Sequence, residues 1–256
     1  GSGTVGEEES HGNDSGVKSL AYQTWRKPLK LAIFDMDGTL MPIDVGVVWV
    51  DFLASKSGAD LSEELALSKR YLEDYRCGRF QVEPFMHFHM ALLSRFSRQN
   101  IERLRERFVE EVVKPNVTSA AKNVVEAMRL EGYLPVLATG TQAFVSETVA
   151  QLFGIEYLLA TRPVVDVRGE FTGECEGGFC YGQHKIDRLK EFCQKLGMPL
   201  TELSESVVYT DSITDLPLLQ FVESFHGHVV ATNPDPQLKE KAQKSGWAVL
   251  KLFDRA

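Results

Sequence analysis

Short apolar runs that end in polar residues recur along the chain from Lys30 onward. The first run is Leu31–Phe34, and later runs occupy 133–138, 207–209 and 229–231. Runs of this length that are apolar throughout are typical of strands buried on both faces of a parallel sheet. Because Asp or Thr follows each run at once, the polar clusters are predicted to meet at the carboxyl edge of that sheet.

Helical periods separate these runs. Apolar residues three and four positions apart occur in 118–132, 143–154 and 186–197, and each segment ends at a glycine. The alternation predicts an α/β fold with a Rossmann-like, doubly wound, mostly parallel sheet as its core. In 163–173, three valines before Arg168-Gly169 and Phe171 after it predict a β-hairpin that leaves the sheet.

Residues 45–115 interrupt this alternation. They contain no apolar run followed by a polar turn, and Glu63–Tyr75 and Ile101–Val113 have the spacing of amphipathic helices. We expect an inserted helical cap here, with 29–44 and 116–256 forming the α/β core. Both ends of the insertion lie near the loop after the first strand, where a lid that moves over the site and selects the substrate would be anchored.

The first 28 residues show no apolar period. Gly1-Ser2-Gly3 resembles a cloning remnant, and Glu7-Glu8-Glu9 opens a polar stretch without a hydrophobic signal core. This composition predicts a disordered tail. No apolar run elsewhere approaches the about 18 residues of a membrane span, and the four cysteines have neither zinc-site nor disulfide spacing. We therefore expect a cytoplasmic protein with no membrane partner.

The charge balance is acidic, with 36 Asp and Glu against 28 Lys and Arg and a net charge of −8. Such a surface repels phosphate backbones, so we expect no nucleic-acid partner. A local pocket of the opposite sign is compatible with this balance, which favours a small-molecule partner. The sequence does not specify an oligomeric state.

Four aspartates follow two of the apolar runs. Asp35 and Asp37 come directly after the first run, and Asp211 and Asp215 follow the third. Either pair alone also fits a turn that caps a helix. Together, at neighbouring strand ends, four negative charges repel strongly in a medium of low dielectric constant, so a cation must accompany them. All the side chains on offer are oxygen ligands, which favours Mg²⁺ over Zn²⁺.

A phosphate-binding cradle is predicted beside these aspartates. Thr139-Gly140-Thr141 offers a hydroxyl and backbone amides at the start of a helix, where an anion is stabilised. Lys185 begins a later helix and adds a positive charge. The expected partner is thus a small phosphorylated metabolite.

At these residues the chain resembles the haloacid dehalogenase superfamily of phosphohydrolases, whose four motifs occur in order. The motifs are hhhDxDGT at Ala32–Thr39, a strand that ends at Thr139-Gly140, Lys185, and DxxxD from Asp211 to Asp215. The helical insertion between the first two motifs is similar to that of the phosphoserine-phosphatase-like branch.

Within that branch the chain resembles a bacterial group of hypothetical phosphatases, some of them histidinol-phosphate phosphatases. The similarity lies in 153–161, 171–173 and 211–219. A polar Asp-Ser-Asp-His-like stretch of that group is replaced here by Asp44-Val45-Gly46-Val47. The resemblance therefore leaves a phosphoserine-like and a histidinol-phosphate-like substrate both open.

The resemblance implies Mg²⁺-dependent hydrolysis of phosphate monoesters through an aspartyl-phosphate intermediate. Asp35 would attack phosphorus, and Asp37 would protonate the leaving alkoxide and later deprotonate water. To protonate the alkoxide, Asp37 must first hold a proton, which requires a raised pKa, and neighbouring Asp35 is the expected cause. The metal would be held by Asp35, Asp211 and the main-chain carbonyl of Asp37, with Asp215 in support either directly or through water.

The remaining implied roles concern the phosphoryl group. Thr139 and the Gly140 amide would hold one of its oxygens, and Lys185 would bridge phosphate and Asp35, so that Thr139 and Lys185 complete the catalytic set. A phosphomutase or other phosphotransferase on the same site, and a phospholigand sensor without turnover, are alternatives.

Two further pairs of residues stand out in the helical segment. His87 and His89 are two positions apart, so they do not share a helix face, and we interpret them as lining or packing residues rather than metal ligands. Arg76 or Arg79 could meet an anionic group of the substrate, although a solvated helix face is the simpler interpretation of each.

Overall fold

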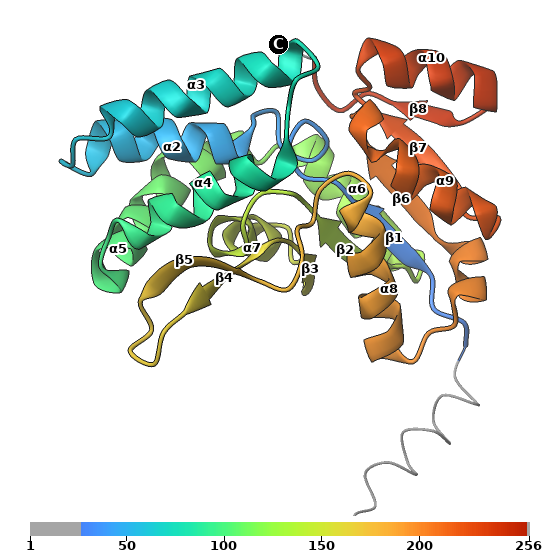
Figure 1. Cartoon of the computed structure of the whole chain (residues 1–256). Coiled ribbons are helices and arrows are strands. Elements are labelled where there is room, and N and C mark those ends of the chain that lie inside the picture. Colours follow the sequence, from blue (N-terminus) through green and yellow to red (C-terminus); the bar gives the residue numbers. More distant parts are fainter. Residues whose placement is uncertain (1–26, 255–256) are drawn as a thin grey trace, which may run out of the picture.

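The centre of the molecule is a parallel β-sheet. The computed structural model describes residues 27–254, so the predicted tail lies outside the described residues except for its last two. Within this range a six-stranded sheet has the order β3-β2-β1-β6-β7-β8, with all neighbours parallel (Figure 1). Its strands are β1 (Leu31–Phe34), β2 (Leu134–Ala138), β3 (Tyr157–Leu159), β6 (Val207–Thr210), β7 (His228–Thr232) and β8 (Ala248–Leu250).

The strand order reverses between β1 and β6. Strands β2 and β3 follow on one side of β1, whereas β6, β7 and β8 lie on the other. In doubly wound sheets the ligand crevice lies at this point, beyond the carboxyl ends of the strands. Asp35 is the first residue after β1 and Asp211 the first after β6. The topology therefore brings the two predicted pairs of aspartates together.

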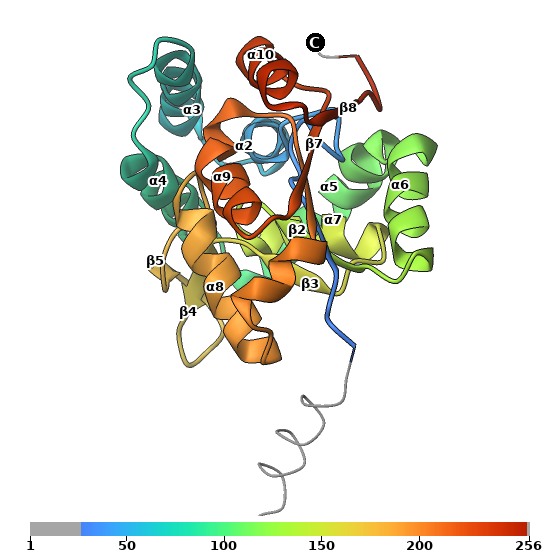
Figure 2. The ribbon, with the colours of Figure 1, turned by 90° about the vertical axis from the view of Figure 1, so that its right-hand side faces the viewer.

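Alternate residues of β1 face two separate apolar cores. Ala32 and Phe34 belong to one core, with α6 and α7, and Leu31 and Ile33 belong to the other, with α8, α9 and α10. Figure 2 shows α8 and α9 on the opposite side of the sheet from α6 and α7. The α/β prediction is confirmed. The helices are α6 (Ser119–Leu130), α7 (Ala143–Leu152), α8 (His184–Leu196), α9 (Leu216–Ser224) and α10 (Pro236–Ser245), with 3₁₀ turns at Leu200–Glu205 and Ile213–Asp215.

Helices α2 to α5 lie between β1 and α6, where the amphipathic spacing predicted helices (Figure 1). Asp44 caps α2, because its side chain accepts a hydrogen bond from Val47 N at 3.1 Å. Trp49 of α2 packs edge-on against Phe144 of α7, which joins this segment to the sheet. The division into cap and core domains stays a prediction. The helices are α2 (Val45–Lys56), α3 (Ser62–Arg76), α4 (Val82–Ser94) and α5 (Arg98–Phe108), followed by a π-helical turn, Val109–Val113, and a 3₁₀ turn, Lys114–Asn116.

The predicted hairpin is formed by β4 (Arg162–Val165) and β5 (Phe171–Glu176), which pair antiparallel outside the main sheet. It packs against α4. At its turn, Glu170 accepts a hydrogen bond from Arg98 N at 2.6 Å, and the Arg98 guanidinium lies 4.6 Å from the centre of the Phe171 ring. The hairpin thus braces the α4–α5 end of the inserted helices. Between residues 27 and 254, no helix is both long and apolar enough to cross a membrane.

Candidate active site

Asp35 lies at the carboxyl end of β1 and is held by two side chains. Its Oδ1 accepts a hydrogen bond from Lys185 Nζ at 3.0 Å, and its Oδ2 accepts one from the Thr39 hydroxyl at 3.0 Å. Burial by itself lowers the pKa of Lys185, but the charges of Asp215 and Asp35 outweigh burial and raise that pKa above its ordinary value. Lys185 is therefore a permanent cation beside Asp35.

The loop after β1 is a tight turn in which Gly38 approaches Asp211. The backbone N–H groups of Thr39, Leu40 and Met41 all point to the carbonyl of Met36. Gly38 has a φ of +79°, and a Cβ at this position would lie 2.2 Å from Asp211 Oδ2. Only glycine fits this position without rearrangement, because the backbone is left-handed and Asp211 leaves no space for a Cβ.

We expect Gly38→Ala to destabilise the fold by more than its backbone strain alone. The left-handed conformation costs about 1 to 2 kcal/mol for alanine, and displacing Asp211 adds about 1 to 3 kcal/mol of overpacking. Gly58 is the matched control, because its φ is +76° and a Cβ there meets nothing within 4 Å. Urea unfolding of both variants measures the difference. Equal losses of stability in Gly38→Ala and Gly58→Ala would contradict the close approach to Asp211.

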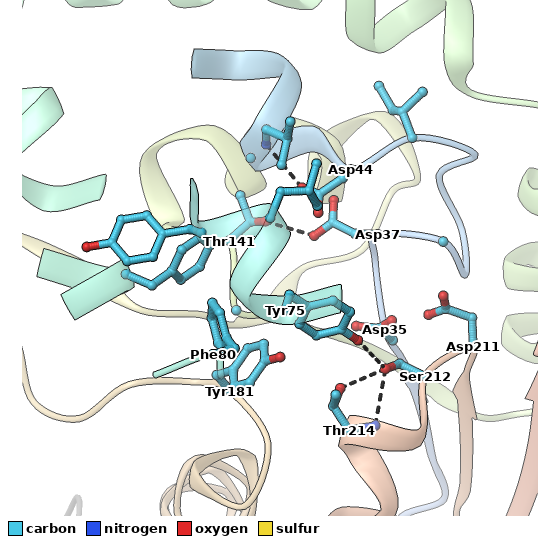
Figure 3. A pocket seen from close by; sticks show the side chains of 18 of the residues that line it. Asp35, Asp37, Asp44, Tyr75, Phe80, Thr141, Tyr181, Asp211, Ser212 and Thr214 are labelled. Atoms are coloured by element: carbon cyan, nitrogen blue, oxygen red, sulfur yellow. Dashed lines mark hydrogen bonds between the residues drawn. The ribbon is translucent and has the colours of Figure 1, made fainter. Parts of the chain in front are cut away.

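Asp37 points away from Asp35, toward α2 and the loop after β2 (Figure 3). Its Oδ1 accepts from Val45 N at 2.7 Å, and its Oδ2 accepts from the Thr141 hydroxyl at 2.8 Å. The pKa of Asp37 is raised well above its usual range, chiefly by burial, then by the charge of Asp44 and only then by that of Asp35. The pKa of Asp37 is raised as expected, but the prediction that Asp35 is the main cause was wrong, because burial and Asp44 both have larger effects.

Asp211 and Asp215 occupy different positions around the same centre. Asp211 Oδ1 and Asp35 Oδ2 each lie 3.0 Å from the Thr39 hydroxyl, so these two carboxylates face a common point. Asp215 is turned toward Lys185 at 3.1 Å and accepts a hydrogen bond from the Thr210 hydroxyl at 2.6 Å. Its oxygens are thus engaged by protein groups, which suits support of the site better than direct metal ligation.

The donor set fits Mg²⁺. Across residues 27–254, no three side chains of His, Cys, Asp or Glu gather into a cluster that could enclose a metal ion. Mg²⁺ does not require such a cage, because it retains several waters and binds through one or two carboxylates together with substrate phosphate. The facing carboxylates of Asp35 and Asp211 match that requirement.

The predicted phosphate cradle follows β2. Thr139 is fully buried, and its hydroxyl accepts a hydrogen bond from Thr141 N at 3.1 Å. Gly140 lies under the ring of Tyr181, which a Cβ at this position would approach to 3.0 Å. Gly140 and Thr141 line a cavity at this edge of the sheet, whereas Thr139 lies beneath the surface of that cavity. The side chain of Thr141, which we had not assigned a role, thus reaches the cavity.

A cavity of about 470 Å³ opens above these residues. Asp35, Asp37, Lys185 and the Asp211 loop line one part of it, and side chains of α3 and α4 line another (Figure 3). Neither Arg76 nor Arg79 is among the lining residues, and Arg79 instead pairs with Asp74 at 3.7 Å. His89 lines the cavity, whereas His87 is exposed and lies 3.6 Å from Glu83.

Asn233, at the end of β7, is a site-supporting residue that we had not predicted. Its Nδ2 donates to the carbonyls of Gly38 at 3.0 Å and Thr39 at 3.2 Å, and its Oδ1 accepts from Leu252 N at 2.6 Å and Phe253 N at 3.2 Å. It thereby ties the loop after β1 to a C-terminal segment that lines the cavity. The polar cluster after the run at 229–231 was the available signal.

Comparison with known proteins agrees with this geometry. The family model for haloacid dehalogenase-like hydrolases matches residues 32–220. Histidinol-phosphatase from Neisseria meningitidis serogroup C is 31% identical over 220 residues, which cover 86% of this chain and 97% of that protein. The crystal structure of a Bordetella pertussis protein of unknown function has a TM-score of 0.82 at 34% identity and covers 89% of this chain and 100% of its own. A phosphoserine phosphatase, solved as a phospho-aspartyl intermediate analogue, shares the fold with a TM-score of 0.60 at 21% identity, covering 89% of this chain and 95% of its own.

The fold, the strand-end carboxylates and these similarities define a hydrolase that acts on phosphoric monoesters. The chain belongs to the haloacid dehalogenase-like hydrolases, in their phosphoserine-phosphatase-like branch.

Proposed function

We propose that this protein is a Mg²⁺-dependent phosphatase of small phosphorylated metabolites that works through an aspartyl-phosphate. The observation that carries the proposal is the placement of Asp35 at the switch point of the sheet, between the Lys185 ammonium and the Thr39 hydroxyl. One carboxylate oxygen attacks phosphorus in line and displaces the alkoxide, and water then attacks the phosphorus of the acyl phosphate.

Asp37 supplies and removes the protons of these two displacements. Its raised pKa favours the protonated form that donates to the leaving alkoxide. After this transfer the carboxylate is ionised and can accept a proton from the attacking water. The Thr141 hydroxyl and Val45 N orient it through both steps.

The positive charges of the site balance the transferred phosphoryl group. Asp35, Asp211 and the main-chain carbonyl of Asp37 would hold Mg²⁺, which would stabilise negative charge on the phosphoryl oxygens. Asp215 orients Lys185, which contacts the phosphoryl group and Asp35. The Gly140 amide, with Thr139 and Thr141 in support, binds another phosphoryl oxygen.

Two substrates follow from the named relatives, histidinol phosphate and phosphoserine. A panel that contains both monoesters separates a phosphatase from the alternatives. A phosphomutase or phosphotransferase would deliver the phosphoryl group to an acceptor alcohol rather than to water. A sensor would bind phosphate analogues without multiple turnovers.

Removal of Mg²⁺ is expected to abolish hydrolysis of p-nitrophenyl phosphate. A metal ion contributes several kcal/mol to stabilising the transition state, so excess EDTA should lower kcat by about a thousandfold or more. Release of p-nitrophenolate, followed by absorbance, measures the rate. Restoring free Mg²⁺ should recover the activity, and this recovery is the control for damage by the chelator. Equal rates with and without EDTA would contradict the metal requirement.

A further inference from the structure

The part of the cavity away from Lys185 is walled by aromatic rings. The rings of Tyr75 and Phe80 are in contact, with 5.8 Å between their centres. The centre of the Phe80 ring also lies 5.3 Å from that of Tyr181 and 5.0 Å from that of Phe85. The Phe85 ring stands edge-on to His89, with 4.5 Å between centres. Figure 3 shows Tyr75, Phe80 and Tyr181 side by side across the cavity from Asp37. All five residues line the cavity, so a bound substrate would contact this wall.

This aromatic wall carries no positive charge. Among the described residues that line the cavity, Lys185 is the one Lys or Arg, and it is engaged by Asp35 and Asp215. An anionic group on the alcohol part of a substrate would therefore be desolvated against the rings without a counter-charge, which is costly. The cavity wall disfavours substrates with a carboxylate or a second phosphate on that part.

His89 is the polar group within this wall. It is 6% exposed, and its ring stands edge-on to Phe85 and Phe88. In residues 27–254 its imidazole has no hydrogen-bond partner, although it lines the cavity. Burial lowers its pKa to about 4, so the ring is neutral near pH 7 and offers one N–H donor and one acceptor nitrogen. An available donor and acceptor inside an aromatic wall point to a ligand that is itself planar and hydrogen-bonding.

We propose that His89, with Phe80, Phe85, Tyr75 and Tyr181, forms a specificity subsite that takes a planar nitrogen heterocycle on the alcohol part of the substrate. The inference rests on the proposed phosphatase function, and it specifies the substrate class as phosphate monoesters that bear such a ring and no carboxylate. The ring packs against Phe80 and Phe85, and one of its nitrogens exchanges a hydrogen bond with the His89 imidazole. His89 acts here as a specificity-determining residue.

Three monoesters test the substrate class: histidinol phosphate, which has an imidazole and no carboxylate, phosphoserine, which has a carboxylate and no ring, and phosphoethanolamine, which has neither. We expect kcat/KM for histidinol phosphate to exceed that for each of the others by at least about tenfold. A kcat/KM for phosphoserine or phosphoethanolamine equal to or above that for histidinol phosphate would overturn the proposal.

Substitutions in α4 test the role of His89. His89→Phe keeps a planar ring but removes the hydrogen bond, so kcat/KM for histidinol phosphate should fall about tenfold while that for phosphoethanolamine is unchanged. His89→Gln retains a donor and an acceptor and should keep more of the activity than His89→Phe. His87→Phe, an exposed position on the same helix, is the matched control and should leave every value unchanged. An equal fall for all substrates in His89→Phe, or no fall, would overturn the proposal.

A binding measurement separates this inference from the proposed function. Asp35→Asn lacks the nucleophile, so calorimetry with Mg²⁺ present can compare binding of histidinol phosphate and phosphoserine without turnover. A preference for histidinol phosphate that His89→Phe removes would support the subsite even if the wild-type protein hydrolysed none of the three monoesters. That lack of hydrolysis would refute the phosphatase proposal alone. Equal binding of both ligands would refute the subsite.

Discussion

Replacement of Asp35 by Asn should lower the hydrolysis of every phosphate monoester by about 10⁴-fold or more, because the amide cannot form the acyl phosphate. The fold should be retained. In the Asp35→Asn variant the amide oxygen could still accept from Lys185, and the amide NH₂ could donate to the Thr39 hydroxyl, leaving the hydroxyl proton for Asp211. All three hydrogen bonds around this position would then persist.

Steady-state kinetics with p-nitrophenyl phosphate measure the loss, and thermal unfolding checks the fold. Asp51→Asn, at an exposed position of α2, is the matched control for loss of one carboxylate and should keep full activity. Activity of Asp35→Asn within tenfold of wild type would remove Asp35 from the role of nucleophile. A large drop in melting temperature would instead show that the Lys185 pair is needed for folding.

Replacement of Asp37 by Asn should lower kcat by about 10² to 10⁴-fold for alkyl phosphates, because a poor leaving group is then expelled without a proton donor. With p-nitrophenyl phosphate the first step should be much less affected, since p-nitrophenolate leaves readily as an anion. The second step still lacks its base. We therefore expect a burst of one p-nitrophenolate per active site, followed by slow turnover.

Rapid mixing with absorbance detection resolves the burst, and the alkyl phosphate is the internal comparison. A loss of the first step that is equal for both leaving groups would contradict the acid role of Asp37. In the wild type, the raised pKa keeps Asp37 protonated at pH values where an ordinary aspartate is ionised. The acid step should therefore persist as pH rises through the usual aspartate range and decline only above the raised pKa.

The position of Asp44 gives this pH dependence a structural origin. Its charge is the second cause of the raised pKa of Asp37, after burial and ahead of Asp35. Asp44 also caps α2, so the first helix of the inserted segment begins at a residue that influences the pKa of Asp37, the proposed catalytic acid. The start of the predicted cap and the electrostatics of the site are therefore coupled through a single side chain.

Much of the catalytic centre could be predicted from local sequence. Buried strands have a continuous apolar pattern, and a parallel sheet places the residues after each strand at one edge, so Asp35 and Asp211 had to lie close together once the α/β pattern was recognised. The helices of the inserted segment and the β4–β5 hairpin were also predictable, because their periods of 3.6 and 2 residues are local properties.

Only the tertiary structure decided which side chains surround each of these groups. Asp37 accepts a hydrogen bond from Thr141, 104 positions away, and Asp35 accepts one from Lys185, 150 positions away. No local period in the sequence encodes such pairings. The dominance of burial over Asp35 in the pKa of Asp37 arises from packing of the whole site. Likewise, His89 faces the cavity while His87 faces solvent, because the rotation of α4 is set by the apolar contacts that it makes with the rest of the chain.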